Sequence, residues 1–273
     1  MTRGSPDRAP DQAPDQAPEG AHDWDPGAYA RFRAERLRPA LDLMMQIETP
    51  PAGGVFDLGC GDGAVAGALR ARFPKRRLVG VDASPAMLAK AKGYDQTILA
   101  DIAGWQPEEK VAVIFSNAAL HWLEDHASLL PRLADMLEPG GVLAVQMPRQ
   151  FGAPSHRFLR DIAGSMFPDK FDFSRYAAPV APALDYLRML RPLGQVAAWE
   201  TDYVQHLAPT EGEHPVRAFT RSTAMRPIAE ALGKSEMTAF LAAYDAALSA
   251  AYPPEADGSV LFTFRRVFFT VKV

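Results

Sequence analysis

The sequence predicts an α/β fold built on a doubly wound, mostly parallel sheet. Apolar strand patterns alternate with helical patterns five times between residues 55 and 147. The first predicted strand runs into a glycine-rich turn and then into a predicted helix over 65–73. Residues 111–115 form a continuous apolar run, which is typical of a strand buried on both faces of a parallel sheet.

The glycine-rich turn carries Gly59, Gly61 and Gly63 at alternate positions after the predicted strand 55–58. Such glycines let a ligand approach the main chain, and the following helix presents backbone N–H groups to it. The spacing also fits the dinucleotide fingerprint, so it does not separate NAD from other nucleotide cofactors. Asp57 is more informative, because a carboxylate here would repel a pyrophosphate and attract a cation. S-adenosylmethionine, with its ammonium and sulfonium and no phosphate, suits such a turn.

Two further strands are predicted to end in acidic residues. The first covers 77–81 and ends at Asp82, where a carboxylate can accept both ribose hydroxyls of an adenosine, and Ser84-Pro85 then caps a helix. The next covers 96–99 and leads to Asp101 and Ile102, which we expect to meet the adenine amino group and ring. An ordinary strand-end or turn aspartate is the competing interpretation of both carboxylates.

The fourth and fifth strands deliver polar residues to the carboxyl edge, where ligands of such sheets bind. The run 111–115 leads to Asn117, His121 and Trp122, and the strand 141–147 places Gln146 near the same edge. Between them we expect a helix over 125–137 and a turn over 138–141. For Trp122 a core position is the alternative.

The second half of the chain alternates differently. Its expected elements are helices over 155–167 and 182–190, a strand over 196–206, helices over 214–232 and 235–252, and a last strand over 260–271 that returns to the sheet. We expect the parts at approximately 151–195 and 207–255 to form a helical lid over the carboxyl edge, which is the usual place for substrate specificity in this architecture.

Composition excludes several classes of protein. The 273 residues carry 29 Lys plus Arg against 33 Asp plus Glu, a net charge of -4, so no global positive field draws the chain to nucleic acid. The single Cys60 cannot form an internal disulfide, and no apolar run reaches the ~20 residues of a membrane helix. We therefore expect a cytoplasmic protein that binds neither nucleic acid nor a membrane. The sequence leaves the oligomeric state open.

The N-terminal region divides near residue 22. Residues 1–22 are rich in proline and short of large apolar residues, which predicts a disordered tail ahead of one domain over 23–273. Helical spacing then extends from Trp24 through Tyr29 to Gln46, with several arginines that include Arg36. These arginines form either a solvated basic face or a cover over the cofactor or an anionic substrate.

The motif Asp57-Leu-Gly-Cys-Gly-Asp-Gly63 resembles the first motif of the class I S-adenosylmethionine-dependent methyltransferases, which have a Rossmann-like fold. From Trp24 to the C-terminus the chain is similar to the trans-aconitate 2-methyltransferase family. The motifs that carry this resemblance are Ala34-Glu-Arg36-Leu-Arg38-Pro-Ala40, Asp82-Ala-Ser-Pro-Ala-Met87, Ala100-Asp-Ile102, Trp105-Gln-Pro107, Asn117-Ala-Ala-Leu-His-Trp122, Gly141-Val-Leu-Ala-Val-Gln-Met-Pro148, Met225-Arg-Pro227 and Phe264-Arg-Arg-Val-Phe268. The chain departs from the family at His121 in place of a glutamine, at Arg265 in place of a proline, and in its N-terminal tail.

The resemblance implies methyl transfer from S-adenosylmethionine to a carboxylate of trans-aconitate, giving a methyl ester and S-adenosylhomocysteine without a metal. A carboxylate is already ionised at neutral pH, so no general base is needed, and catalysis rests on orientation in a site closed to water. Such a site should hold arginines and neutral donors for forked hydrogen bonds to a polycarboxylate. His121 and Trp122 are expected to line it.

The expected site residues follow from these motifs and from strand ends. For the cofactor they are Asp57, Gly59, Gly61, Gly63, Asp82, Ala83, Asp101, Ile102 and Asn117. For the substrate they are Arg226, Arg266, His121, Trp122, Gln146, Arg149, Trp24, Tyr29 and Arg36, and a structural role is the alternative for each arginine. Three other functions stay open: a methyltransferase acting on another small molecule or an acyl carrier, a nicotinamide-dependent oxidoreductase, and a catalytically silent module that binds S-adenosylmethionine.

Overall fold

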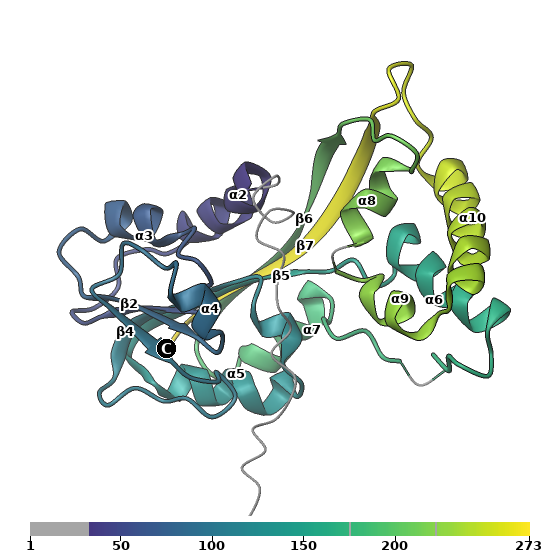
Figure 1. Ribbon diagram of the computed structural model, residues 1–273. Coiled ribbons are helices and arrows are strands. Elements are labelled where there is room, and N and C mark those ends of the chain that lie inside the picture. The colour runs from purple at the N-terminus through teal and green to yellow at the C-terminus, as the bar shows by residue number, and fades with distance from the viewer. Residues whose placement is uncertain (1–32, 175, 222) are drawn as a thin grey trace, which may run out of the picture.

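The computed structural model describes residues 33–174, 176–221 and 223–273. The predicted tail, Trp24 and Tyr29 lie outside these residues, and so does the side chain of Arg36. One seven-stranded sheet with strand order β3-β2-β1-β4-β5-β7-β6 organises the chain (Figure 1). Its strands are β1 Val55–Leu58, β2 Leu78–Asp82, β3 Gln96–Leu99, β4 Val111–Asn117, β5 Leu137–Pro148, β6 Gln195–Leu207 and β7 Val260–Lys272.

The strand directions confirm the predicted sheet. Strands β1 to β5 are parallel, and the four residues of β1 and the first six of β4 are buried, as continuous apolar runs require. The last strand, β7, returns antiparallel between β5 and β6. The carboxyl ends of β1, β2, β4 and β5 therefore share one edge with Arg266, which is opposite Pro148 in the register.

Helices cover both faces of the sheet. On one face, α2 (Arg33–Met44) and α3 (Ala66–Arg72) pack into a cluster that includes Leu43, Leu69 and Phe268. On the other face, α5 (His126–Asp135) and α7 (Ala183–Leu190) pack into a cluster with Leu130 and Tyr186. The short helices α4 (Pro85–Leu88) and η1 (Leu120–Trp122) follow β2 and β4. Ser84 caps α4 as predicted, since its side chain accepts from the N–H of Met87.

The predicted turn at 138–141 lies within β5 rather than before it. Along β4, the β5 partner changes from Leu137, opposite Val111, to Val142, opposite Val113, so the intervening residues leave the regular ladder. They are held instead by the C-terminus, because the N–H of Gly140 donates to the carbonyl of Val273. Gly140 takes a positive φ of 80°, as a glycine in a turn does, so the predicted turn is present. The hydrogen bonds that make the turn residues part of β5 were not predicted.

A helical subdomain packs on the part of β6 and β7 that extends past β5. Strand β6 pairs with β7 as far as Val260, whereas β5 pairs only as far as Arg266 (Figure 1). The subdomain consists of α6 (Pro154–Met166), α8 (Pro215–Arg221), α9 (Arg226–Ala231) and α10 (Lys234–Ala251). Its core joins these helices to the strand ends through residues such as Leu159, Val216, Ile228, Phe240 and Phe262.

The expected lid ranges include one helix that packs elsewhere. Tyr186 and Leu190 of α7 are fully buried in the core beneath the sheet, so α7 is a layer of the central fold. Of the helices described in these two ranges, α6, α8, α9 and α10 lie beyond the carboxyl edge. Among the helices that the structure describes, none has the length and apolar character needed to cross a membrane.

Candidate functional site

The glycine-rich turn is folded so tightly that its glycine positions leave little room for side chains. Gly59, Gly61 and Gly63 all take positive φ values. A Cβ on Gly59 would lie 2.1 Å from the Cβ of Ala119, and a Cβ on Gly63 would lie 2.8 Å from the carbonyl oxygen of Lys92. The turn thus brings the end of β1 against the segments that follow β4 and α4.

Asp82 fixes the shape of this turn from the end of β2. Its carboxylate oxygens accept from the N–H groups of Gly61 and Ser84, each at 2.8 Å. A carboxylate has about four lone-pair positions, so each oxygen keeps room for one more donor. Ala83, next to it, is exposed. The geometry leaves Asp82 able to bind a diol while it holds the turn.

Asp57 is buried beneath the turn, where only 2% of the residue is exposed. Its Oδ2 accepts a 2.6 Å hydrogen bond from the hydroxyl of Tyr94. Burial raises the pKa of Asp57 to about 7, against the smaller opposing effect of the Tyr94 bond. Burial also raises the pKa of the Cys60 thiol, with further contributions from Asp57 and Asp82. The turn is therefore a region of negative potential.

The segment after β3 lies against the same turn. Ile102 is buried, and its Cδ1 would be 3.8 Å from a Cβ on Gly59. Asp101 is exposed, and its Oδ1 accepts from the N–H of Ala103 at 2.9 Å. An exposed carboxylate thus precedes, in sequence, the apolar side chain that lies beside Gly59.

A second polar cluster lies at the carboxyl ends of β4 and β5. Asn117 and Gln146 are opposite each other in the register. Arg266 is only 5% exposed, and its Nη1 donates to Oε1 of Gln146 at 3.2 Å. The guanidinium carbon lies 4.7 Å from the centroid of the Phe264 ring. A buried cation is thus held by an amide and an aromatic face at the edge where the parallel strands end.

Three polar atoms around this cluster are buried without a hydrogen-bond partner in the described part of the chain: Oδ1 of Asn117, Nδ1 of His121 and Nε2 of Gln146. Buried polar groups normally have a hydrogen-bond partner, so these three atoms mark a place where a ligand or an ordered water would supply one. Burial, together with the positive charge of Arg266, lowers the pKa of His121 to about 3. The imidazole is therefore neutral at physiological pH.

Comparison with known proteins identifies the family. A methyltransferase domain model matches residues 29–201. A trans-aconitate 2-methyltransferase from Azoarcus sp. strain BH72 is 41% identical over 249 residues, which cover 90% of this chain and 97% of the relative. The enzymes of that name from Methylobacterium nodulans and Shigella flexneri are 42% and 38% identical, and each alignment covers 92% of this chain and 98% of the relative. The chain belongs to the trans-aconitate 2-methyltransferase family.

Among solved structures, the YcgJ protein of Bacillus subtilis aligns with a TM-score of 0.53 at 14% identity, covering 86% of this chain and 98% of that protein. At this identity the likeness concerns the fold alone. Together with the methyltransferase domain model and the seven-stranded, mostly parallel sheet, this likeness confirms the predicted Rossmann-like class I methyltransferase fold.

Arg149, which follows the fifth strand and was expected in the substrate site together with Arg266, faces the other side of the sheet. Its Nη1 lies 3.2 Å from Oε2 of Glu200, whose other oxygen accepts from the N–H of Ala183 at the start of α7. Side chains alternate across a strand, so Arg266 shares the α2 face with Phe268, whereas Arg149 belongs to the α7 face. The structure therefore does not bring the two arginines into one site.

The family residue Arg226 begins α9 of the helical subdomain. Its Nη2 lies 3.6 Å from Oε1 of Glu230 on the same helix, and 37% of its side chain is exposed.

Trp122 is 64% exposed at the carboxyl edge, with its ring 4.6 Å from the ring of His121. The core alternative for Trp122 is therefore wrong.

Two tyrosines form hydrogen bonds near the candidate site that were not predicted from the sequence. Tyr94 lies in a loop whose sequence gives no sign of its bond to Asp57. Tyr203 is opposite Phe264 in the register, and its hydroxyl donates to Oδ2 of Asp42 in α2 at 2.7 Å. A buried tyrosine needs a partner for its hydroxyl, but the sequence does not say which one.

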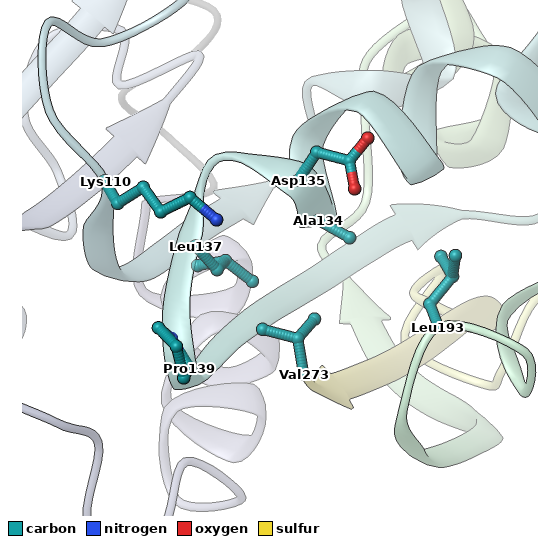
Figure 2. Close-up of a pocket in the computed structure, with 7 residues that line it drawn as sticks. All are labelled: Lys110, Ala134, Asp135, Leu137, Pro139, Leu193 and Val273. Atoms are coloured by element: carbon teal, nitrogen blue, oxygen red, sulfur yellow. The ribbon is translucent and has the colours of Figure 1, made fainter.

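A surface pocket of about 280 Å³ lies far from this chemistry. Figure 2 shows it at the start of β5, lined by residues that include Lys110, Asp135, Pro139 and Val273. This is the amino edge of the parallel strands, opposite the glycine turn and Arg266. Ligands of such sheets bind at the carboxyl edge, so we assign the candidate site to the edge that holds the glycine turn and Arg266, and not to this pocket.

Proposed function

We propose that this protein transfers a methyl group from S-adenosylmethionine to a carboxylate of trans-aconitate, giving the methyl ester and S-adenosylhomocysteine. The observation that carries the proposal is the buried Arg266–Gln146 pair, surrounded by unpartnered polar atoms at the sheet edge that also holds the glycine turn. A buried cation beside a free amide donor suits a carboxylate. The names of the relatives supply the specific acid.

The residues of the turn fit the cofactor. Asp82 would accept the ribose hydroxyls, and Ile102 would pack on the adenine with Asp101 near its amino group. The acidic surroundings of the turn favour a cationic ligand over the pyrophosphate of NAD. Bound S-adenosylmethionine supplies an electrophilic methyl group, and the carbon–sulfur electron pair stays with sulfur when the carboxylate oxygen takes the methyl.

The titration of His121 argues for an acceptor that arrives already ionised. With a pKa of about 3, its imidazole is a weak base that would not activate a phenol or an amine. A carboxylate with a pKa of about 4 needs no base at pH 7. His121 instead offers a ring nitrogen for orientation, and catalysis rests on holding the oxygen in line with the methyl group.

A tricarboxylate brings more negative charge than one arginine balances. Arg266 would hold one carboxylate by its planar fork, with Nε2 of Gln146 as a neutral donor. We propose Arg226 as a second contact at the rim, which requires it to exchange its long pair with Glu230 for the substrate. The exposed Trp122 would cover the acceptor.

An acceptor panel tests this function. The protein is incubated with S-adenosylmethionine and equal concentrations of a tricarboxylate, dicarboxylates, a monocarboxylate, a phenol and an amine, and S-adenosylhomocysteine formation is measured. We expect kcat/KM to be highest for trans-aconitate and to fall with each carboxylate removed. A preference for the phenol or the amine would overturn the proposal.

A further inference from the structure

Tyr94 is packed under the glycine turn at the point where β1 and β2 meet. Its ring would lie 3.3 Å from a Cβ on Gly63 and 3.1 Å from a Cβ on Gly80, so these glycines make the space that the ring fills. Its hydroxyl reaches Asp57 at 2.6 Å. A side chain between two glycines has little freedom to move, so the direction of this hydrogen bond is fixed.

In the hydrogen bond between Tyr94 and Asp57, the tyrosine is the donor and the carboxylate is the acceptor. Burial and the charge of Asp57 raise the pKa of Tyr94, so the phenol stays protonated and donates. The bond stabilises the charged form of Asp57, while burial and the neighbouring Asp82 favour the neutral form. Asp57 is therefore balanced between its two protonation states near neutral pH. The other titratable groups that act on this cluster are Cys60 and Asp62.

The two forms of the proposed cofactor differ in one charge. S-adenosylmethionine has a positive sulfur, whereas S-adenosylhomocysteine has a neutral one, and the amino acid and adenosine portions are the same. An anionic Asp57 beneath the turn therefore attracts the reactant more than the product, whereas a protonated Asp57 does so less. Selectivity between reactant and product depends on how firmly the carboxylate is kept ionised.

We infer that Tyr94 is a positioning residue that keeps Asp57 oriented and ionised beneath the glycine turn, so that the protein prefers S-adenosylmethionine over S-adenosylhomocysteine. This inference rests on the proposed cofactor. Its consequence is relief of product inhibition, since the neutral-sulfur product gains less from Asp57 than the reactant does. Proton release accompanies binding of the reactant near pH 7, because the bound cation favours the ionised carboxylate.

The test is calorimetric titration of the full chain with both ligands, from pH 6 to pH 8.5. Tyr94→Phe removes the hydroxyl and keeps the ring. Since a hydrogen bond to a charged group shifts its ionisation by about one to two pKa units, the Kd of S-adenosylmethionine at pH 7 should rise roughly tenfold. The Kd of S-adenosylhomocysteine should change by less than about twofold, and the difference should narrow at pH 8.5, where Asp57 ionises without help.

Two further variants separate this role from a structural one. Tyr186→Phe removes another buried hydroxyl, bonded to His126 at 2.7 Å on the α7 face, and should leave the ratio of the two affinities unchanged. In the Asp57→Asn background, Tyr94→Phe should no longer change that ratio, because no charge is left to stabilise.

Equal weakening of both ligands at every pH by Tyr94→Phe would overturn the inference, since a packing defect does not distinguish a charged sulfur from a neutral one. If the single variant Asp57→Asn kept the wild-type ratio of the two affinities, the inference would be overturned as well, because the charge of Asp57 would then not distinguish the ligands. Failure of the wild-type protein to bind either ligand would instead contradict the proposed cofactor, so the two failures are distinguishable.

Discussion

Arg266→Lys is the substitution that tests the proposed carboxylate site most sharply. Lysine keeps the positive charge but loses the planar fork that matches a carboxylate. Arg266 is only 5% exposed, so solvent does not screen its interactions as it does at the surface. The loss of one hydrogen bond between charged groups costs about 1.5 to 3 kcal/mol, which corresponds to a fall of roughly ten- to a hundredfold in kcat/KM for trans-aconitate.

The neighbouring residue supplies a matched control. Arg265 is opposite Asp202, forms two hydrogen bonds with it at 2.7 and 2.8 Å, and points to the other face of the sheet with 48% of its side chain exposed. Such surface pairs contribute ~0–1 kcal/mol, so Arg265→Lys should change kcat/KM by less than about fivefold. It should leave the Kd of S-adenosylmethionine unchanged.

The assay is steady-state kinetics with trans-aconitate, together with calorimetric titration of the cofactor and a thermal melt. We expect Arg266→Lys to lose activity while it retains the wild-type cofactor Kd, and the thermal melt shows whether the variant is folded at the assay temperature. Near-normal kinetics in a folded Arg266→Lys protein would refute the assignment of this residue. An equal loss in Arg265→Lys would show that the effect arises from the strand and not from the site.

Four other perturbations follow from the site. Asp82→Ala should weaken S-adenosylmethionine and S-adenosylhomocysteine alike, by about 3 kcal/mol, because it removes the acceptor for two shared hydroxyls as well as the bonds to Gly61 and Ser84; unchanged affinity by calorimetry would place the ribose elsewhere. The pKa of Asp57 is raised from 3.8 to about 7, so its contribution favours folding at low pH and is lost as the pH rises through about 7. Asp57→Asn should therefore flatten this decline in the free energy of unfolding by up to ~4 kcal/mol. Parallel wild-type and mutant pH profiles in urea melts would contradict the burial of Asp57. Arg226→Lys should raise KM for trans-aconitate with little change in cofactor affinity, whereas a lower Tm and an equal loss with every acceptor would indicate that Arg226 braces the helical subdomain. Deletion of residues 1–22 should alter neither Tm nor turnover, and a clear drop in either would mean that the segment docks on the domain.

Much of the fold could be predicted because its signals are local. Apolar runs identified β1, β4 and β7, and the Ser84-Pro85 pair identified the start of α4. The bonding within β5 was missed, since the residues around Gly140 are held by the C-terminus rather than by neighbours in sequence. The sheet-facing position of α7 was missed because an amphipathic helix packs equally well on a sheet or on other helices.

The residues of the candidate site were likewise predicted correctly where the signal is local, and not where it depends on long-range pairing. Strand ends and glycines placed Asp82, Gly59 and Gln146 at one edge, because parallel strands end together. Arg149 and Arg266 were expected in one site, yet strand alternation puts them on opposite faces. That separation depends on the register between β5 and β7, which is a long-range property of the antiparallel return and is not encoded by local spacing.

The central claim is that the acceptor atom is a carboxylate oxygen of trans-aconitate. Mass spectrometry of a reaction containing the full chain, S-adenosylmethionine labelled in its methyl group and trans-aconitate tests it directly. We predict a labelled monomethyl ester that forms in equal amount with S-adenosylhomocysteine and is cleaved by mild alkali, as an ester is. Cofactor turnover without this ester, or label in an alkali-stable ether or amine product, would contradict the account.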